Sequence, residues 1–321
     1  NAIINWVKQR YDLVVAKEMI NFVPGIVPGI GMAMNCFTQK GDKVMIQPPV
    51  YHPFAWVTTR NERTLVINPL RWENGMYRMD LDAFREQIKG CKLFILCNPH
   101  NPGGVVWTEA ELRAIADICY DEKVLVFSDE IHADLTLPPH THRPFATVSE
   151  KARMNSVTFM SPSKAFNMPG LSASHALIFN EDLRKRFRIY MDAGELDMGH
   201  VFAFLSVEAA YSHGTEWLDQ CLAYIQGNID FVDEFLKKHA PKIKAIRPEA
   251  SYLVWLDCRE LELSQKDLNE FFVDKAHLAL NDGEMFGKEG IGFMRLNVAS
   301  PRCIIEKAMK QLADAYQLYI K

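Results

Sequence analysis

The sequence lacks the features that mark several large classes of protein. Its 321 residues contain no run of about 18 apolar residues, so no segment is long enough to cross a membrane as a helix. The seven cysteines are scattered without a Cys-x-x-Cys pair, which predicts reduced, mostly buried thiols in a reducing, cytoplasmic compartment. A net charge of −4 without a basic cluster argues against a nucleic-acid partner.

Two other motifs are incomplete. Gly25, Gly29 and Gly31 do not form the G-x-G-x-x-G pattern, and no acidic residue follows at the distance that a ribose contact requires. A nicotinamide-dependent dehydrogenase is therefore disfavoured. His140 and His142 resemble a metal-binding pair, but two prolines precede them and no clear third ligand accompanies them, so we expect a loop and no metal site.

What is present is an alternation of short β-rich runs with helical patterns. The expected strands are residues 44–47, 64–67, 93–97, 124–129, 156–160 and 174–179. The expected helices are residues 26–38, 53–60, 81–88, 108–121 and 182–191, and a capping box of Thr108 and Glu111 marks the start of one of them. Strands that alternate with helices, and that are apolar on both faces, predict an α/β protein with a three-layer αβα domain and a mainly parallel sheet.

The pattern changes after about Gly214. One long amphipathic helix over residues 216–238 comes first, followed by β-rich runs at 242–247, 252–257 and 293–298, a helix from Ser264 and a last helix after Pro301. We therefore expect a large domain over residues 1–215 and a smaller α+β domain over residues 216–321.

Four polar motifs stand out along this framework. They are Asn-Pro-His-Asn-Pro-Gly at 98–103, Ser-Asp-Glu-Ile-His at 128–132, Ser-Pro-Ser-Lys at 161–164 and Met-Arg-Leu-Asn at 294–297. Three of them follow apolar strands directly. Because ligands of open α/β sheets bind outside the carboxyl ends of the strands, we expect these motifs to converge on one cleft.

The residue types suit a cofactor that acts as an electron sink, such as pyridoxal 5'-phosphate (PLP). Such a cofactor needs a lysine for a Schiff base, an acid beside the ring nitrogen, donors for the phosphate, a flat side chain over the ring and a cation for the substrate carboxylate. In that order the chain offers Lys164, Asp129, Ser161 and Ser163 with the loop at 25–29, Tyr51, and Arg295. Taken alone, each would be read as a surface, capping or ion-pair residue; their order along the chain favours the cofactor.

These motifs resemble those of fold-type I PLP-dependent enzymes of the class I/II aminotransferase superfamily. More narrowly, the chain is similar to the MalY/PatB group of carbon–sulfur lyases, which includes cystathionine β-lyase and cystalysin. The narrower resemblance rests on residues 47–54, 97–102, 128–134 and 161–167, and it extends over essentially the whole chain.

The resemblance implies a role for each matching residue at the cofactor ring. Lys164 would carry PLP and move the Cα proton. Asp129 would pair with the pyridine nitrogen, and Asn101 would bond the 3'-oxygen. Tyr51 would stack on the ring. His132 would lie beside the cofactor, where many aminotransferases carry a tyrosine, and it favours the lyase group.

The phosphate and the substrate have their own implied ligands. Ser161, Ser163 and the backbone N–H groups of Ile26 and Val27 would hold the phosphate. Arg295 would bind the substrate carboxylate through two parallel hydrogen bonds, which a lysine could not reproduce, with Asn101 and Tyr51 also facing the substrate.

The implied activity is α,β-elimination of cystathionine- or cysteine-type amino acids to pyruvate, ammonia and a thiol, in a homodimer. Two alternatives stay open: an aminotransferase on the same scaffold, and an inactive or regulatory protein with this fold. Two departures from the family pattern bear on activity. Residues 168–174 lack the arginine that often binds the phosphate in aminotransferases, and we expect an arm of several tens of residues before Asn1 in the native protein.

Overall fold

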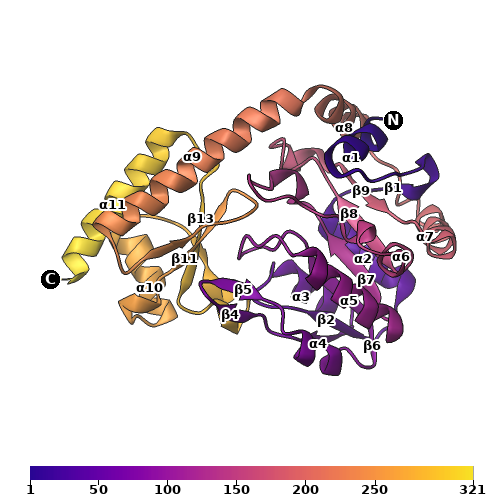
Figure 1. The fold of residues 1–321 in the computed structure, drawn as a ribbon, viewed down its shortest axis with the longest axis horizontal. Coiled ribbons are helices and arrows are strands. Elements are labelled where there is room, and N and C mark those ends of the chain that lie inside the picture. Colours follow the sequence, from indigo (N-terminus) through magenta and orange to yellow (C-terminus); the bar gives the residue numbers. More distant parts are fainter. Residues whose placement is uncertain (321) are drawn as a thin grey trace.

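A seven-stranded sheet forms the centre of the larger lobe (Figure 1). The computed structural model describes residues 1–320, so Lys321, the last residue of the expected second domain, lies outside the described residues. The strand order is β1-β9-β8-β7-β6-β2-β3, and the four neighbouring pairs from β8 to β3 are parallel, while β9 runs antiparallel to both of its neighbours. The strands are β1 (Ile20–Val23), β2 (Lys43–Ile46), β3 (Thr64–Ile67), β6 (Cys91–Cys97), β7 (Leu125–Asp129), β8 (Ser156–Met160) and β9 (Ser174–Leu177).

Helices cover both faces of this sheet. One layer consists of α2 (Ile26–Phe37), α3 (Pro53–Arg60) and α7 (Glu181–Ala193), and the other of α4 (Leu81–Gln87), α5 (Glu109–Asp121) and α6 (Glu150–Met154). Strand β6 contributes alternate residues to the two cores, with Leu93 and Ile95 in one and Phe94 and Leu96 in the other. The alternation follows from the period of two in a strand. The predicted three-layer fold with a mainly parallel sheet is confirmed.

The predicted strands and helices of the larger lobe lie within three residues of the observed boundaries. The side chain of Thr108 accepts a hydrogen bond from the backbone N–H of Glu111, and the side chain of Glu111 accepts one from the N–H of Thr108, so the capping box is present at the start of α5. The start of α5 is therefore set by a local pattern that the sequence displays directly.

The smaller lobe contains a four-stranded antiparallel sheet and, within the described residues, three α-helices. The strand order is β10-β11-β13-β12, and the strands are β10 (Lys244–Ile246), β11 (Leu253–Asp257), β12 (Asn281–Asp282) and β13 (Phe293–Asn297). The helices are α9 (Thr215–His239), α10 (Gln265–Glu270) and α11 (Arg302–Ile320). Helix α9 runs from one lobe to the other (Figure 1). It begins beside the expected domain boundary at 215–216. One hydrophobic cluster, however, joins the buried face of α9 to residues of both lobes. The division into two domains therefore stays a proposal.

Several elements were not among those expected from the sequence, including the strands β1, β4 (Arg71–Glu73), β5 (Met76–Arg78) and β12 and the helices α6 and α8 (Val201–His213). The chain begins with helix α1 (Ala2–Tyr11). The β4–β5 hairpin packs against the smaller lobe, where Trp72 lies 5.4 Å from the ring of Phe293. Helix α1 packs on α8, with Trp6 stacked on Tyr211 at 4.8 Å. Among residues 1–320, no helix is both long enough and apolar enough to cross a membrane.

Candidate active site

A cavity of about 360 Å³ lies where the two lobes meet. Nine of the ten predicted site residues line it: Ile26, Val27, Tyr51, Asn101, Asp129, His132, Ser163, Lys164 and Arg295. The tenth, Ser161, is buried behind Ser163 and does not line the cavity. The expectation that motifs far apart in the chain meet in one place therefore agrees with the geometry. Three of the motifs follow the neighbouring strands β6, β7 and β8 of one sheet, and the fourth lies in the smaller lobe, at residues 293–297.

Asp129 ends strand β7 on the floor of this cavity. It lies opposite Cys97 in the β6–β7 pairing, and its side chain is 4% exposed. One carboxylate oxygen accepts a hydrogen bond of 3.1 Å from the N–H of Ile131. Burial raises the pKa of Asp129 to about 7, and the neighbouring charges of Glu130 and Lys164 act in opposite directions on it. A carboxylate in this position lacks a full counter-charge and is suited to a cationic ligand group.

Lys164 projects into the cavity from a tight turn after β8. The N–H of Phe166 bonds to the carbonyl of Pro162 at 2.9 Å, and Asn167 takes a left-handed conformation that ends the turn. Burial lowers the pKa of the Lys164 amine, and the charge of Arg295 lowers it further, while Asp129 raises it. A larger fraction of neutral amine makes Lys164 a better nucleophile and base than an exposed lysine.

Two groups of donors lie at the end of the cavity suited to an anion. The first is the N-terminus of the 12-residue helix α2, which begins at Ile26 and Val27, and whose first amides have no intrahelical partner. The second is the pair of serines. Ser161 donates to the carbonyl of Ala173 at 2.7 Å and lies 2.9 Å from the hydroxyl of Ser163, so Ser161 fixes Ser163, which faces the cavity.

Arg295 reaches the opposite side of the cavity from β13. Its Nη1 donates to Asn101 at 2.9 Å, and its Nη2 donates to Asn281 at 2.8 Å. Its Nε is buried and has no hydrogen-bond partner among the described residues. The guanidinium lies over the ring of Phe286, 4.7 Å from its centroid, and burial lowers its pKa. The arginine is therefore held in place and retains donor capacity.

His132 and Tyr252 face each other across the site, with ring centroids 6.3 Å apart. Burial lowers the pKa of His132 to about 3, and the charges of Lys164 and Arg295 act in the same direction, so its imidazole is neutral at physiological pH. The Nδ1 atom of His132 is buried without a partner among the described residues. Burial raises the pKa of Tyr51 and of Tyr252, so both phenols stay protonated.

Sequence reasoning missed Asn281 and Tyr252. Asn281 pairs with Arg295 in the β12–β13 register, and this pairing brings its side chain to the guanidinium. Tyr252 follows Ser251, which has a positive φ of 82° and whose N–H bonds to the carbonyl of Leu135 at 2.9 Å. Neither residue belongs to a recognisable local motif, so only the tertiary pairing reveals them.

His142, one half of the suspected metal pair, lies inside the protein. It shares a 2.8 Å hydrogen bond with Glu130, whose carboxylate also accepts from the hydroxyl of Ser128 and from the N–H of Phe145. His140 is instead on the surface, 3.7 Å from Glu249. Residues 1–320 contain no group of three His, Cys, Asp or Glu side chains placed to hold a metal ion.

Comparison with known proteins identifies the family. The model of the family "Aminotransferase class I and II" matches residues 1–312. The chain belongs to this family.

Relatives within the family place the chain more narrowly. Cystathionine beta-lyase PatB of Bacillus subtilis is 38% identical over 317 residues, which span 98% of this chain and 82% of the relative. Protein MalY of Escherichia coli is 29% identical over 98% of this chain and 80% of its own length. The solved structure of cystalysin from Treponema denticola, which contains pyridoxal 5'-phosphate, has a TM-score of 0.97 at 34% identity and covers all of this chain and 82% of that one. The predicted resemblance to the MalY/PatB group is confirmed.

Proposed function

We propose that the chain is a PLP-dependent carbon–sulfur β-lyase, which eliminates a thiol from cystathionine- or cysteine-type amino acids and releases pyruvate and ammonia. The observation that carries this proposal is the convergence of Lys164, Asp129 and Arg295 on one cavity between the lobes. The relatives named as cystathionine beta-lyases and the PLP-containing cystalysin support the same activity.

The residues that line the cavity fit PLP. The buried carboxylate of Asp129, with its raised pKa, matches a protonated pyridine nitrogen, because the added positive charge would stabilise the ionised acid. The Nδ1 atom of His132 and the Nε–H group of Arg295 are buried without a hydrogen-bond partner among the described residues. Each can therefore form a hydrogen bond with a ligand, the arginine as a donor. The N-terminus of α2 and the hydroxyl of Ser163 suit a phosphate group.

Each residue then has a distinct task. When bound, PLP supplies an electron sink that stabilises negative charge at the α-carbon of the substrate. Lys164 would hold the cofactor covalently and afterwards, released as a free amine, remove the Cα proton as a general base. Asp129 would keep a proton on the ring nitrogen. Tyr51 would cover the ring, and Asn101 would donate its free amide N–H to the 3'-oxygen, since its carbonyl oxygen already accepts from Arg295.

Arg295 would orient the substrate through its carboxylate so that the Cα–H bond faces Lys164. After proton removal the bond between Cβ and sulfur breaks, and the electron pair leaves with the sulfur as a thiolate. The neutral imidazole of His132 cannot act as a cationic acid at physiological pH, so its task is to orient groups by hydrogen bonding.

Lys164→Ala tests this proposal together with a substrate assay. The wild-type protein should be yellow, should lose its visible absorbance on reduction with borohydride, and should release pyruvate and a free thiol from L-cystathionine over many turnovers without a keto acid. Lys164→Ala should abolish turnover. A Lys164→Ala protein that stays yellow and active would contradict the lysine's role, and product that forms only when a keto acid is added would identify an aminotransferase.

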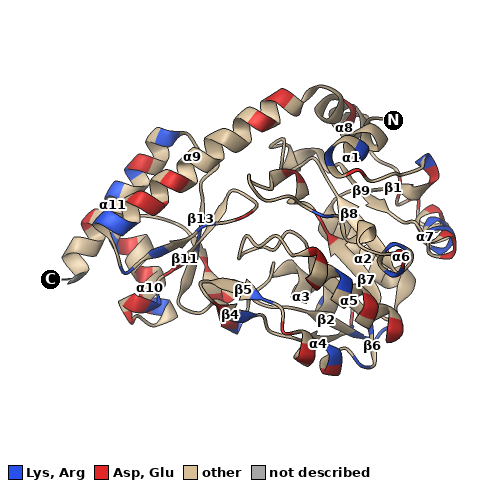
Figure 2. Cartoon of the chain, in the orientation of Figure 1, with Lys and Arg blue, Asp and Glu red and all other residues tan. Residues whose placement is uncertain are grey.

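We also propose that the enzyme is a cytoplasmic homodimer. The seven cysteines are all free, which supports a reducing compartment. Helix α8 and the turn before it expose a set of large apolar side chains, each at least half exposed: Met198, Val201, Phe202, Phe204 and Leu205. Figure 2 shows that charged residues are frequent on α7, α10 and α11 but sparse on α8. Several large exposed apolar side chains on one helix with few charges are typical of a protein–protein interface, and a second copy of the chain is the proposed occupant.

A further inference from the structure

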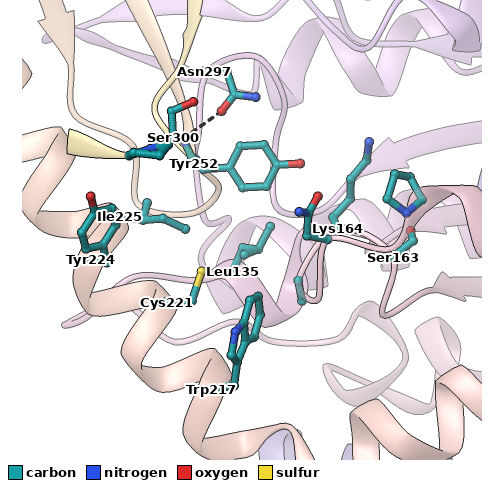
Figure 3. A pocket seen from close by; sticks show the side chains of 15 residues that line it. Leu135, Ser163, Lys164, Trp217, Cys221, Tyr224, Ile225, Tyr252, Asn297 and Ser300 are labelled. Carbon is teal, nitrogen blue, oxygen red and sulfur yellow. Dashed lines mark hydrogen bonds between the residues drawn. The ribbon is translucent and has the colours of Figure 1, made fainter. Parts of the chain in front are cut away.

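The residues around the active-site cavity are supported from behind in two different ways. On the side of Lys164 the support includes the aromatic ring of Trp217 on α9, which lines a pocket together with the lysine (Figure 3). On the side of Asp129 the support is polar and buried, and it centres on Glu130 and His142, whose side chains are 0% and 1% exposed. Neither Glu130 nor His142 lines the active-site cavity.

Glu130 follows Asp129 directly and lies on the other side of the strand end. Successive side chains of an extended chain alternate between two faces. Strand β7 ends at Asp129, and the N–H of Glu130 still bonds to the carbonyl of Phe159, in β8, at 2.9 Å. Asp129 therefore faces the cavity, whereas the side chain of Glu130 lies beside that of Ser128. A displacement of Glu130 moves the backbone that carries Asp129.

The carboxyl group of Glu130 makes three hydrogen bonds. Its Oε1 accepts from the hydroxyl of Ser128 and from the N–H of Phe145, each at 2.8 Å, and its Oε2 lies 2.8 Å from Nε2 of His142. His142 is the only basic side chain that pairs with Glu130 within residues 1–320. A buried charged pair is costly to desolvate, and apolar residues of similar volume often stabilise a fold equally well. The pair therefore points to a task in positioning.

The loop that carries His142 also holds a second cofactor motif. This loop, residues 142–145, is called the brace loop. The carbonyl of Arg143 accepts a 3.1 Å hydrogen bond from the side chain of Asn98, which is 1% exposed and begins the Asn-Pro-His-Asn-Pro-Gly motif. The N–H of Asn98 in turn donates to the carbonyl of Asp129 at 2.9 Å. The brace loop is thus bonded to the segments that follow β6 and β7, where each reaches the cavity.

Glu130 also acts on Asp129 through its charge. Burial is the largest cause of the raised pKa of Asp129, and the charge of Glu130 raises it further, while Lys164 lowers it. A positively charged ring nitrogen beside Asp129 would interact with two carboxylates, one in contact with it and one behind.

We propose that Glu130 and His142 are positioning residues of the active site, which hold Asp129 and the motif that begins at Asn98 in the geometry that binds the cofactor. They act through the brace loop and touch neither cofactor nor substrate. This inference rests on the proposed PLP-dependent function and adds the support behind its ring-nitrogen site.

Replacement of His142 tests the proposal through cofactor binding. His142→Ala removes the partner of Oε2 and should weaken PLP binding by about tenfold, the scale of one lost hydrogen bond to a charged group, and shift the visible absorption band. His142→Gln offers an amide N–H in place of Nε2–H and should restore most of the affinity and the band. Arg143→Ala is the matched control, because the Arg143 side chain is exposed and Asn98 uses only its backbone carbonyl.

These titrations are made well below the melting temperature of each variant. A His142→Ala protein that melts earlier, yet keeps the wild-type PLP affinity and absorption band, would reduce the pair to a purely structural role and overturn the proposal. An equal loss of affinity in Arg143→Ala would also overturn it, because the effect would not then depend on the buried pair.

Glu130→Gln separates this inference from the proposed function, because its test uses the cofactor-free protein. The amide keeps the volume of the side chain and removes its charge. At about pH 8, Asp129→Asn should raise the melting temperature of the wild type, since it removes a buried carboxyl with a raised pKa. The gain should be smaller in the Glu130→Gln background, where Asp129 is easier to ionise.

An equal gain in the two backgrounds would show that Glu130 does not act on Asp129, and it would overturn the proposal even in an active lyase. A smaller gain, in a protein that binds no PLP and forms no pyruvate, would support the action of Glu130 on Asp129 and refute the proposed function.

Discussion

The guanidinium of Arg295 donates a 2.9 Å hydrogen bond to the side-chain oxygen of Asn101, and this bond joins the two lobes directly across the active-site cavity. Asn101 lies in the loop after β6, and Arg295 lies in β13 of the smaller sheet. Because Asn281 holds the other terminal nitrogen of the guanidinium, the arginine is oriented before a substrate arrives. Such pre-orientation reduces the entropy lost when the substrate carboxylate binds.

Replacement of Arg295 by lysine should therefore impair substrate binding more than the loss of one hydrogen bond would suggest. Lysine is a single point donor and cannot reach the carboxylate, Asn101 and Asn281 together. We expect kcat/KM to fall by about 100-fold, chiefly through KM, in a pyruvate assay. Arg302→Lys is the matched control, since Arg302 is also hydrogen-bonded but faces α9. A KM that does not change would exclude Arg295 as the carboxylate ligand.

Asn281→Ala and Asn101→Ala should differ in their spectra. Both variants remove one support of Arg295, and each should raise KM by about tenfold, as expected for the loss of one hydrogen bond to a charged group. Only Asn101 is also proposed to contact the cofactor, so only Asn101→Ala should shift the visible absorption band. A spectral shift in Asn281→Ala would mean that β12 influences the cofactor directly.

The pKa of Asp129 gives a prediction about stability. In the unfolded chain this carboxyl has a pKa near 3.8, and in the folded, cofactor-free protein the pKa rises to about 7. Between these values the folded state binds more protons, so this group's contribution to stability falls as pH rises and levels off above about pH 7. Asp129→Asn removes the free-energy cost of ionising this buried carboxyl. The cofactor-free variant should melt at a higher temperature than the wild type at about pH 8, and the difference should shrink toward about pH 4.

The same substitution should weaken cofactor binding, because asparagine offers no negative charge to the ring nitrogen. Titration of the two cofactor-free proteins with PLP measures this effect at a pH where both are folded. An Asp129→Asn variant that melts below the wild type at high pH would show that the carboxylate is stabilised in the fold by something other than the cofactor.

The fold could be predicted from the sequence because it follows from local patterns, and the residues that line the cavity could be named in advance because their motifs resemble those of a known family. Apolar runs define β6 and β7, and Asp129 ends one of them, so its place at the edge of the sheet follows. Helix α8 could not be predicted in the same way, because it is apolar on all sides and lacks a helical period. Asn281 lies in a strand of two residues whose position depends on pairing with β13.

The exposed surface of α8 predicts the oligomeric state. If two copies pair through it, the double variant Phe202→Asp with Leu205→Asp should convert a dimer into a monomer, because each copy would bury two unpaired carboxylates at the interface. Size-exclusion chromatography with light scattering gives the mass directly. Leu318→Asp is the control, as Leu318 is 77% exposed on α11 and carries no proposed contact. A wild-type monomer at micromolar concentration would contradict the homodimer.

Asp134 links the N-terminal helix to the turn that carries His132. The indole N–H of Trp6 donates to its carboxylate at 3.0 Å, and the hydroxyl of Tyr11 donates to the same oxygen. The carboxylate is buried, and burial raises its pKa. Asp134→Ala would leave the buried indole N–H of Trp6 and the partly buried hydroxyl of Tyr11 without an acceptor, at a cost of about 1–3 kcal/mol for the buried donor and less for the other.

We therefore expect Asp134→Ala to lower the urea midpoint markedly and Asp134→Asn, which keeps an acceptor oxygen, to lower it much less. Because Leu135 donates its N–H to the carbonyl of His132 at 2.9 Å, movement of this turn should also reach the cofactor and shift its absorption band. A double-mutant cycle with Tyr11→Phe isolates the Tyr11–Asp134 term. If the two substitutions are additive, the Tyr11–Asp134 contact contributes nothing to stability, and α1 holds the turn through Trp6, by its hydrogen bond to Asp134 and its packing.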